Sequence, residues 1–382
     1  MSLSSQKHLF QLPDDVHYLN CAYMSPLLKS VEEAGIRGLQ RKRNPTAITP
    51  ADFFSETEAV KAKFARLVNG PSAQMAVIPS ASYGLSTAMA NVPGSRGQYA
   101  VMVADEFPSG VYALQDWCRR HGTNCHTVPP PDSRAGRGAS WNHRLLEAIN
   151  ADTAVVLISS VHWTDGTIFD LEAVGRRCKD VGAVFIVDGT QSVGAKPIDV
   201  QAAQIDALVV AAYKWMMGPY SIGMAYYSPY FNNGFPLENS WMTRANAHDF
   251  TSLTNYTDAY FPGAARYDMG EFSNFMLMPM LDAALSQLLE WEPARIQDYA
   301  GRLTAPLIDR LLANGFGLED PDWRAKHLFG FQLPPHMDKT ALMQLLQSKR
   351  IYVSTRGSAI RVSAHAFNTQ DDVEALMEAL TN

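Results

Sequence analysis

Residues 183–227 read AVFIVDGTQSVGAKPIDVQAAQIDALVVAAYKWMMGPYSIGMAYY, and this stretch decides the fold. It contains three apolar runs rich in Val, Ile and Ala, which cover residues 183–187, 207–212 and 222–227. Runs of this length and composition are typical of strands that are buried on both faces, as in the sheets of α/β proteins. The stretch therefore predicts the centre of such a sheet.

Polar residues stand where the first two apolar runs stop. Asp188 ends the first run, Gln191 follows on its turn, and Tyr213 and Lys214 end the second run. Ligands of open α/β sheets bind beyond the carboxyl ends of the strands, so we expect Asp188, Gln191 and Lys214 to meet one small molecule. Taken singly, each residue has an ordinary structural alternative, because a lysine at a strand end is usually solvated and Asp-Gly-Thr is a common turn.

A carboxylate, an amide and an amine in one crevice suit pyridoxal phosphate (PLP). The lysine amine forms a Schiff base with the aldehyde, the carboxylate keeps the pyridine nitrogen protonated, and the amide hydrogen-bonds the ring oxygen. The order Asp-x-x-Gln, with Lys214 placed 26 positions after Asp188, resembles the class V family of PLP-dependent enzymes. That family contains cysteine desulfurases, selenocysteine lyases, kynureninase and some aminotransferases.

The resemblance covers nearly the whole chain of 382 residues, in the right order. It implies an α/β protein with the type I PLP-dependent transferase fold, in which helices flank a mostly parallel central sheet beside a smaller α+β domain. We expect a large PLP-binding domain over residues 17–262 and a small domain over residues 263–382, with the N-terminal segment 1–50 partly packing with the small domain. Helices are predicted over residues 28–42, 54–68 and 141–150.

A candidate phosphate site lies in residues 75–92, MAVIPSASYGLSTAMANV, where a short apolar strand gives way to small residues and a helical pattern. A helix that begins near Ser82 would direct its positive end at an anion. An ordinary serine N-cap is the structural alternative. The family places a Gly/Thr/Ser loop here to hold the PLP phosphate. Since Ala81 stands where a hydroxyl residue is common, we expect Ser82 and backbone amides to carry the contact.

Three more residues are candidates for contacts with the cofactor. Phe107 follows the predicted strand over residues 98–105 and is expected to lie against the pyridine ring, although a Phe at a strand end is more often core. Thr164 stands near the position where the family usually has an Asn that contacts the ring oxygen, and its neighbour His162 is equally well explained as a structural histidine. Tyr213 resembles the kynureninase branch, and its hydroxyl is expected to reach the phosphate.

The resemblance also assigns residues to the substrate. Arg361, in the sequence Arg-Val-Ser, resembles the family's arginine that grips the α-carboxylate of the substrate, for which a bidentate guanidinium is the best match. Arg356 is a second candidate. Asn20 lies in the segment 17–27, which resembles the family's N-terminal stretch that leads into the active site.

Residues 266–274 predict contact with a second subunit. Their sequence, RYDMGEFSN, resembles the family motif that reaches across a homodimer to the neighbouring subunit's phosphate, so the active sites are expected to be shared. Glu271 replaces the threonine of the motif and would repel a phosphate. We therefore expect Ser273 or Asn274 to make the contact.

Composition limits the partners. Charged residues make up 18%, below the roughly 25% of an average soluble protein, and 47% are hydrophobic, which predicts extensive burial that includes a subunit interface. The net charge of −6 argues against nucleic acid. The longest apolar runs have strand length and residues 1–16 lack a signal-peptide core, so we expect a cytoplasmic protein that does not bind membranes. The cysteines have neither metal-ligand nor disulfide-framework spacing, so reduced thiols and no metal are expected at Cys21, Cys118, Cys125 and Cys178.

These residues favour a PLP-dependent enzyme that acts on an α-amino acid. Desulfurases of the family place a nucleophilic cysteine shortly before the carboxylate-binding arginine, whereas residues 348–361 here contain no cysteine. This disfavours a persulfide-forming desulfurase, unless Cys21 or Cys118 folds into the site. By resemblance to the desulfurase and kynureninase branches we rank β-elimination first, as in a carbon–sulfur or selenocysteine lyase that releases its leaving group directly. Aminotransfer and epimerisation need the same residues and stay open as alternatives.

Two other classes of protein fit the sequence less well. A PLP carrier without activity would need no arginine for the substrate carboxylate. A nicotinamide-dependent dehydrogenase would show G-x-G-x-x-G after its first strand, and the sequence contains no such motif there.

Overall fold

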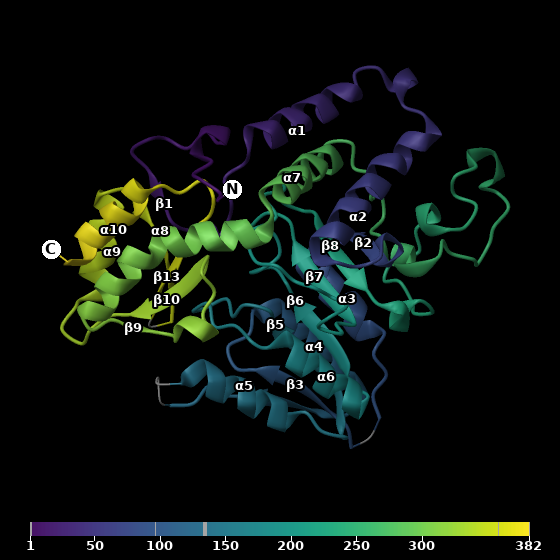
Figure 1. The fold of residues 1–382 in the computed structure, drawn as a ribbon. Coiled ribbons are helices and arrows are strands. Elements are labelled where there is room, and N and C mark those ends of the chain that lie inside the picture. Colours follow the sequence, from purple (N-terminus) through teal and green to yellow (C-terminus); the bar gives the residue numbers. More distant parts are fainter. Residues whose placement is uncertain (1, 96, 133–135, 358, 382) are drawn as a thin grey trace.

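A seven-stranded sheet forms the centre of the computed structural model, which describes residues 2–95, 97–132, 136–357 and 359–381 (Figure 1). The strand order is β2-β8-β7-β6-β5-β3-β4, and every neighbouring pair from β7 to β4 is parallel. Only β8 runs antiparallel to its neighbours. The strands are β2 (Met75–Ile78), β3 (Tyr99–Val103), β4 (Asn124–Val128), β5 (Thr153–Ser159), β6 (Val184–Asp188), β7 (Ala207–Ala211) and β8 (Gly223–Tyr227). The predicted α/β class with a mostly parallel sheet is confirmed.

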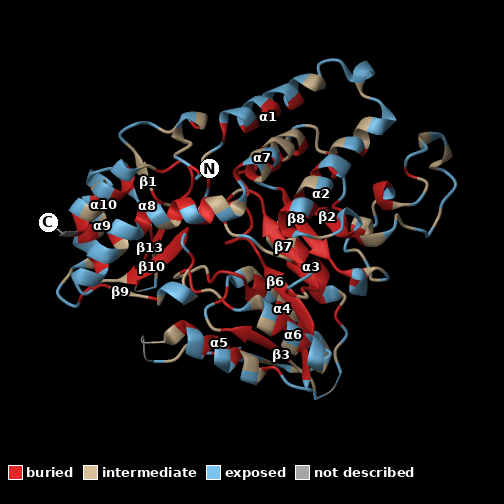
Figure 2. Ribbon diagram, in the orientation of Figure 1, coloured by how far each residue is buried: buried red, intermediate tan, exposed pale blue. Residues whose placement is uncertain are grey.

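The three apolar runs of the opening stretch form β6, β7 and β8. Every residue of these strands is buried (Figure 2). Their side chains divide between two apolar clusters, one on each face of the sheet. Since β6 and β7 are parallel neighbours, with Asp188 paired to Val209, their carboxyl ends meet at one edge of the sheet. This edge receives Asp188 and the turn that carries Lys214.

Helices cover both faces of the central sheet (Figure 1). The predicted helices at 28–42 and 54–68 are confirmed to within one residue, and the one predicted at 141–150 begins earlier, at Arg137, after Gly136 in the left-handed region (φ 64°). The helices are α1 (Lys29–Arg41), α2 (Ser55–Val68), α3 (Ala81–Ala90), α4 (Pro108–His121), α5 (Arg137–Ala148), α6 (Leu171–Val181) and α7 (Leu277–Trp291). Helix α7 packs against α1 and α2.

The C-terminal part is a smaller α+β unit beside the central sheet (Figure 1). Its antiparallel sheet has the order β12-β13-β10-β9, and the N-terminal strand β1 pairs in parallel with β11. The limits of the two domains at residues 262 and 263 stay a prediction. The elements are β1 (His17–Tyr18), α8 (Pro293–Ala313), β9 (Gly317–Leu318), β10 (Leu328–Gln332), α9 (Lys339–Ser348), β11 (Ile351–Tyr352), β12 (Ser354–Arg356), β13 (Ala359–Ser363) and α10 (Gln370–Thr381).

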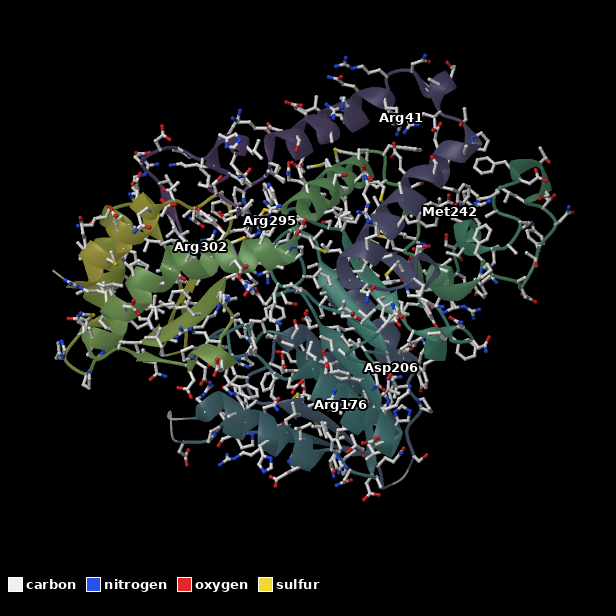
Figure 3. All side chains as sticks on the ribbon, viewed as in Figure 1. Arg41, Arg176, Asp206, Met242, Arg295 and Arg302 are labelled. Carbon is white, nitrogen blue, oxygen red and sulfur yellow. The ribbon has the colours of Figure 1, made fainter. Side chains whose placement is uncertain are left out.

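Polar contacts fasten the N-terminal segment to the rest of the fold. Arg302 on α8 donates a hydrogen bond to the Leu3 carbonyl at 3.0 Å, and Arg41 at the end of α1 bonds Asp52 at 2.5 Å and Glu56 at 3.0 Å (Figure 3).

Within the described ranges, no helix is both long and apolar enough to cross a membrane.

We predict that Gly175 in α6 does not tolerate a side chain. A Cβ at Gly175 would meet the backbone oxygen of Ala203 at 1.9 Å, whereas a Cβ at Gly301 in α8 would meet only the flexible side chain of Lys326, at 2.8 Å. Gly175→Ala should therefore destabilise the protein by about 1–3 kcal/mol, because α6 must move off the turn before β7. Gly301→Ala should be neutral or stabilising by up to about 1 kcal/mol, because alanine favours helix. Thermal unfolding of the two variants tests this, and equal melting temperatures would contradict the close approach at Gly175.

Candidate active site

A cavity of about 320 Å³ lies at the carboxyl edge of β6 and β7, and we call it the lysine cavity. Its walls come from the start of α3, the segment after β3, the turn after β6 and the turn after β7. The structure therefore brings together most of the predicted cofactor residues from segments far apart in the sequence. The predicted residues that line it are Ala81, Ser82, Phe107, Asp188, Gln191, Tyr213 and Lys214.

Asp188 is a buried carboxylate without a cation bound to it. Its side chain is 7% exposed, and Oδ1 accepts a hydrogen bond from the Thr190 amide at 2.9 Å. Burial raises the pKa of Asp188, although the hydrogen bonds from Thr190 and the positive charge of Lys214 oppose the rise. A carboxylate in this state is strongly stabilised by a protonated nitrogen, because the partner replaces the solvation that burial removed.

Lys214 is a buried amine that lines the same cavity. It is 6% exposed, and burial lowers its pKa to about 8, against the opposing effect of the Asp188 charge. Nζ lies 5.3 Å from the centre of the Phe107 ring and 5.5 Å from that of Tyr213. A lysine with this pKa carries a substantial neutral fraction near neutral pH, which is the form that attacks a carbonyl group.

The N-terminus of α3 points its unpaired amides toward the cavity. The N-cap is Ser80, whose Oγ accepts a hydrogen bond from the Tyr83 amide at 3.2 Å and lies 2.9 Å from Ser82 Oγ. The first turn of a ten-residue helix that lines a cavity at its N-terminus is a site for an anion. The serine N-cap and the anion site, which the sequence offered as alternatives, are therefore compatible.

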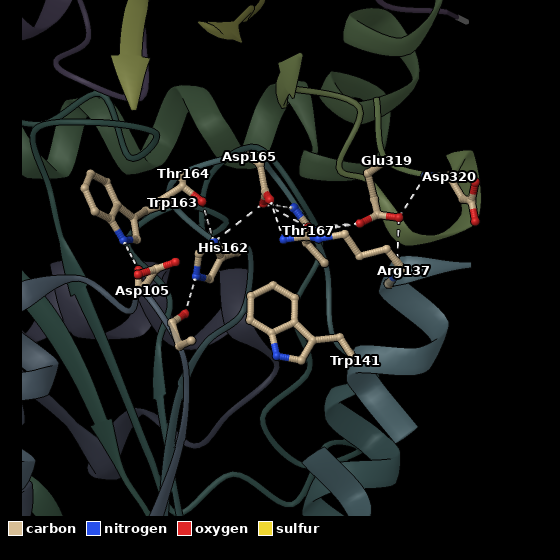
Figure 4. A network of polar contacts seen from close by, with 12 residues as sticks. Asp105, Arg137, Trp141, His162, Trp163, Thr164, Asp165, Thr167, Glu319 and Asp320 are labelled. Carbon is tan, nitrogen blue, oxygen red and sulfur yellow. Dashed lines mark hydrogen bonds and ion pairs between the residues drawn. The ribbon is translucent and has the colours of Figure 1, made fainter. Parts of the chain in front are cut away.

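His162 is held by a polar network at the end of β5 (Figure 4). It is buried, with Nδ1 2.7 Å from Thr164 Oγ1 and Nε2 3.0 Å from the Ala104 carbonyl. Burial disfavours its charged form, but Asp165, 3.5 Å from Nδ1, and the charge of Glu106 outweigh this effect and raise the pKa. Both ring nitrogens have partners inside the fold, so His162 is a structural histidine.

The same network joins the central sheet to the C-terminal unit (Figure 4). Arg137 at the start of α5 bonds Asp165 at 3.0 Å and Glu319, after β9, at 2.7 Å. Glu319 also accepts hydrogen bonds from the Gly138 amide at 3.1 Å and the Thr167 hydroxyl at 3.4 Å. These contacts fix the C-terminal unit against the segment that follows β5.

Trp163 forms a wall between the lysine cavity and a second cavity of about 590 Å³, because it lines both. Its Nε1 donates a hydrogen bond to the Asp105 carbonyl at 2.6 Å (Figure 4). Its ring meets the Phe107 ring edge-on, with centres 5.4 Å apart. Thr164, a predicted cofactor residue, lines the second cavity and not the lysine cavity. Its role toward the cofactor stays a prediction.

The two predicted substrate arginines approach the same tryptophan. Arg361 on β13 is buried and donates a hydrogen bond through Nη1 to the Trp163 carbonyl at 2.6 Å. Its Nε and Nη2 find no partner among the described residues, and neither does Nε of Arg356, whose guanidinium lies 5.4 Å from the Trp163 ring centre. Burial, with a contribution from Arg356, lowers the pKa of Arg361 to about 9. Such donors fit an anionic ligand.

Three predicted residues, Arg361, Asn20 and Ser273, line neither cavity. Asn20 accepts a hydrogen bond from the Ser354 hydroxyl at 2.7 Å, and Ser273 is buried just before α7. The resemblance assigned Ser273 to the neighbouring subunit's phosphate, so its place outside the cavity of its own chain neither supports nor opposes that role. The roles of Asn20 and Ser273 stay predictions.

Sequence reasoning missed a buried carboxylate beside the site. Glu106 accepts hydrogen bonds from the Ser159 amide at 2.7 Å and from its hydroxyl at 2.5 Å, and Ser159 pairs with Asp188 across β5 and β6. Burial raises the pKa of Glu106 against the charge of His162. The sequence feature that could have indicated this residue is a glutamate at a strand end, directly before Phe107. Glu106 fixes the end of β5 relative to the ring of Phe107.

Cys21 also lies close enough to Lys214 for their charges to interact. It is fully buried, and burial raises the pKa of its thiol although the positive charge of Lys214 opposes the rise. All four cysteines are free thiols. Because the thiolate is the nucleophilic form, Cys21 is poorly suited to attack a substrate.

Comparison with known proteins connects this site to one family. The family described as "Aminotransferase class-V" matches residues 46–376. The "Uncharacterized aminotransferase YcbU" of Bacillus subtilis (strain 168) is 22% identical over 330 residues, which are 86% of this chain and 84% of that protein. The cysteine desulfurase IscS of Shewanella baltica (strain OS223) is 38% identical over 117 residues, which are only 30% of this chain and 28% of that protein.

Solved structures give the same fold at low sequence identity. The cystine C-S lyase C-DES, in complex with its reaction product cysteine persulfide, superimposes with a TM-score of 0.81 over 96% of this chain and 97% of its own, at 17% identity. At this identity the similarity establishes the fold alone. The predicted fold and family are both confirmed.

We predict that Lys214 of the cofactor-free protein titrates near pH 8, because burial lowers its pKa to about 8. Only the neutral amine is acylated, so labelling of Lys214 should rise steeply through pH 8, about two pH units below an ordinary lysine. Competitive labelling with acetic anhydride, read by peptide mass spectrometry, measures the midpoint, and the exposed Lys326 normalises the samples. Asp188→Asn removes the charge that raises the pKa, so it should lower the midpoint further. A midpoint above about pH 10 for Lys214 would contradict the desolvated site.

Proposed function

The chain belongs to the class V aminotransferase family and is a PLP-dependent enzyme, and from this premise we propose that it is a lyase that catalyses β-elimination from an α-amino acid. One observation carries the proposal. Trp163 lines the cavity that contains the buried Asp188 and Lys214, and its carbonyl accepts a hydrogen bond from Arg361. The Nε and Nη2 of Arg361 have no partner among the described residues. A lysine amine in the cavity and a guanidinium beside Trp163 that keeps two donor atoms without a partner in the described part of the chain suit a substrate that has an α-carboxylate.

The lining of the lysine cavity fits PLP. The first turn of α3 with Ser82 would hold the phosphate, Asp188 would pair with the pyridine nitrogen, and Gln191 would donate to the ring oxygen. Phe107 would cover the ring face. When bound, PLP withdraws electrons from the α-carbon of an attached amino acid, which weakens the bonds at that carbon and allows a group on the β-carbon to leave.

The chain's own residues supply binding and proton transfer. Arg361 binds the α-carboxylate through Nε and Nη2, and this contact fixes which bond of the α-carbon faces Lys214. Lys214, with its pKa near 8, takes the α-proton at neutral pH. The electron pair of the broken Cα–H bond then forms a double bond between the α- and β-carbons, and the β-substituent leaves the β-carbon with its own bonding pair. The substituent is released to solvent, because residues 348–361 contain no cysteine to accept it.

The relatives support this proposal to different degrees. C-DES is a cystine C-S lyase, which supports a carbon–sulfur bond as the one that breaks. YcbU bears the name of an aminotransferase, and aminotransfer needs the same lysine and arginine. Epimerisation does as well. Elimination ranks first by likeness to the desulfurase and C-S lyase structures, and no cysteine that could accept sulfur is among the described residues that line the lysine cavity.

We predict that the holoenzyme releases pyruvate and ammonia from β-substituted amino acids without a keto acid. β-Chloroalanine, cystine and selenocysteine are the substrates to screen, with pyruvate and ammonia measured in the presence and absence of a 2-oxo acid. Lys214→Ala should lower the rate by about 10²–10⁴-fold, because it removes the proton carrier, and should abolish the borohydride-stable link of the cofactor to this residue.

Two results decide against this reading. Turnover that appears only when a 2-oxo acid is supplied would favour the aminotransferase. Loss of α-deuterium without pyruvate would favour epimerisation.

A homodimer is part of the proposal. Large apolar side chains are exposed in or just before α1 and α7, which pack together. A patch of this kind on a single chain is typical of an interface with another molecule. Tyr220, which is exposed and lines the lysine cavity, supports a second copy close to the site. The exposed residues are Tyr23, Met24, Leu27, Ile36, Leu39 and Met276.

We predict that Leu39→Asp weakens the dimer at least about tenfold, because it buries a charge at the interface. Leu39 is 66% exposed on a single chain, so the substitution should leave the fold of the subunit intact. Leu312→Asp on α8, where the leucine is 53% exposed, is the matched control and should not change assembly. Sedimentation at micromolar concentration reads both variants. A monomeric wild-type protein that retains full activity would rule the dimer out.

A further inference from the structure

Trp215 follows Lys214 directly and reaches back to Gln191. Its indole Nε1 donates a hydrogen bond to Gln191 Oε1 at 2.8 Å, and both residues are buried. An indole nitrogen is a donor only, so the atom that faces Trp215 must be the oxygen of the amide. The orientation of the Gln191 amide is therefore determined by its partner and is not interchangeable with the flipped form.

The nitrogen of the Gln191 amide therefore faces away from the Trp215 indole. Nε2 donates one hydrogen bond to the Ala22 carbonyl at 3.2 Å, which uses one of its two N–H groups. Gln191 lines the lysine cavity, so the second N–H is available to a ligand there. In the flipped amide the oxygen would take this place and would repel the ring oxygen of PLP.

The packing around Trp215 permits little movement. Its ring stands edge-on to the ring of His327, with centres 4.4 Å apart at 86°, and lies 5.9 Å from the ring of His365. His327 Nε2 donates to the backbone oxygen of Gln191 at 2.7 Å, while Nδ1 accepts from the Gln297 amide. Burial lowers the pKa of His327 to about 4, so this neutral tautomer persists at neutral pH. Gln191 is thus held at its main chain by His327 and at its side chain by Trp215.

The turns that carry Gln191 and Trp215 also meet through their main chains. Gly194, at φ 102°, approaches Trp215 so closely that a Cβ would lie 2.2 Å from the Trp215 oxygen. The Met217 amide donates to the Lys214 carbonyl at 3.2 Å and closes the turn after the lysine. The lysine and the glutamine therefore belong to one rigid assembly, and Trp215 is the side chain that links them.

We propose that Trp215 is a positioning residue that locks the Gln191 amide so that its N–H, and not its oxygen, faces the ring oxygen of the cofactor. The inference rests on the proposed function, because it needs PLP in the lysine cavity. A donor at this position stabilises the anionic form of the ring oxygen, so the lock affects both the affinity for PLP and the distribution of the bound cofactor between its absorbing forms.

Trp215→Phe in the holoenzyme tests the proposal, because it keeps an aromatic ring and removes the N–H. We expect the dissociation constant of PLP to rise about five- to tenfold, the effect of one hydrogen bond, and the ratio of the two visible absorption bands at a fixed pH to change. Trp117→Phe is the matched control, since its buried indole donates to the Val92 carbonyl at 2.8 Å away from the lysine cavity. It should leave both readouts within about twofold of the wild type.

A double-mutant cycle separates the lock from a general loss of packing. In a Gln191→Leu background, Trp215→Phe should cause no further change in the band ratio, because no amide remains to be oriented. An equal effect in both backgrounds would overturn the proposal. If Trp215→Phe does not fold, benzothienylalanine at this position replaces the N–H by sulfur in a ring of similar size and takes its place, with the same outcomes expected.

The inference and the proposed function fail in different ways. Wild-type protein that holds no cofactor linked to Lys214 overturns the proposed function. Wild-type protein that holds it, together with a Trp215→Phe variant of unchanged spectrum and affinity, overturns the inference alone.

Discussion

The burial of Asp188 and Lys214 at one edge of the sheet is the constraint on which the site depends. Desolvation of an ionised side chain costs several kcal/mol even after the protein relaxes. Burial shifts the pKa of Asp188 upward and that of Lys214 downward, so each side chain is pushed toward its neutral form. The two residues line one cavity. A ligand with a protonated ring nitrogen and an electrophilic carbon would meet both needs, and this match supports the proposal that the cofactor binds at this edge of β6 and β7.

Arg361 lies on a different sheet from Asp188 and Lys214, so its position depends on how the C-terminal unit is held against the rest of the chain. β13 is held by β10, and the C-terminal unit is fixed to α5 through Arg137 and Glu319. Gly138 allows this approach, because a Cβ there would lie 2.3 Å from the side chain of Trp323. Glu319 is buried and Arg137 half-buried, so loss of Arg137 would leave a buried charge uncompensated. Arg137 also bonds Asp165, two residues after the Trp163 that Arg361 contacts, so the position of Arg361 depends on this network.

The sequence predicted the structure correctly where a local pattern of apolar residues is combined with a rule on the topology of the sheet. Apolar runs predicted β6, β7 and β8, and the rule that ligands bind at carboxyl ends of parallel strands brought Asp188, Gln191 and Lys214 to one cavity. The sequence did not predict contacts between segments that lie far apart in the chain, because no periodic pattern of residues marks such contacts. The hydrogen bond of Trp215 to Gln191, and that of Glu106 to Ser159, depend on the packing of side chains between strands. Thr164 was placed by resemblance at a strand end, but the turn after β5 directs it to the second cavity.

The chemistry of sulfur at this site follows from where the thiols lie. Cys118 and Cys178 are buried in α4 and α6, in the apolar clusters on the two faces of the sheet. Cys21, the thiol whose charge interacts with that of Lys214, has its pKa raised by burial, and the amine that might lower it is itself partly neutral. A thiolate at Cys21 would lie in the same desolvated surroundings as Lys214. These surroundings favour the neutral form of the lysine amine and also the neutral form of the thiol, so they disfavour the thiolate. The burial that favours the neutral amine of Lys214 thus disfavours the thiolate of Cys21, which agrees with the proposed release of the leaving group to solvent.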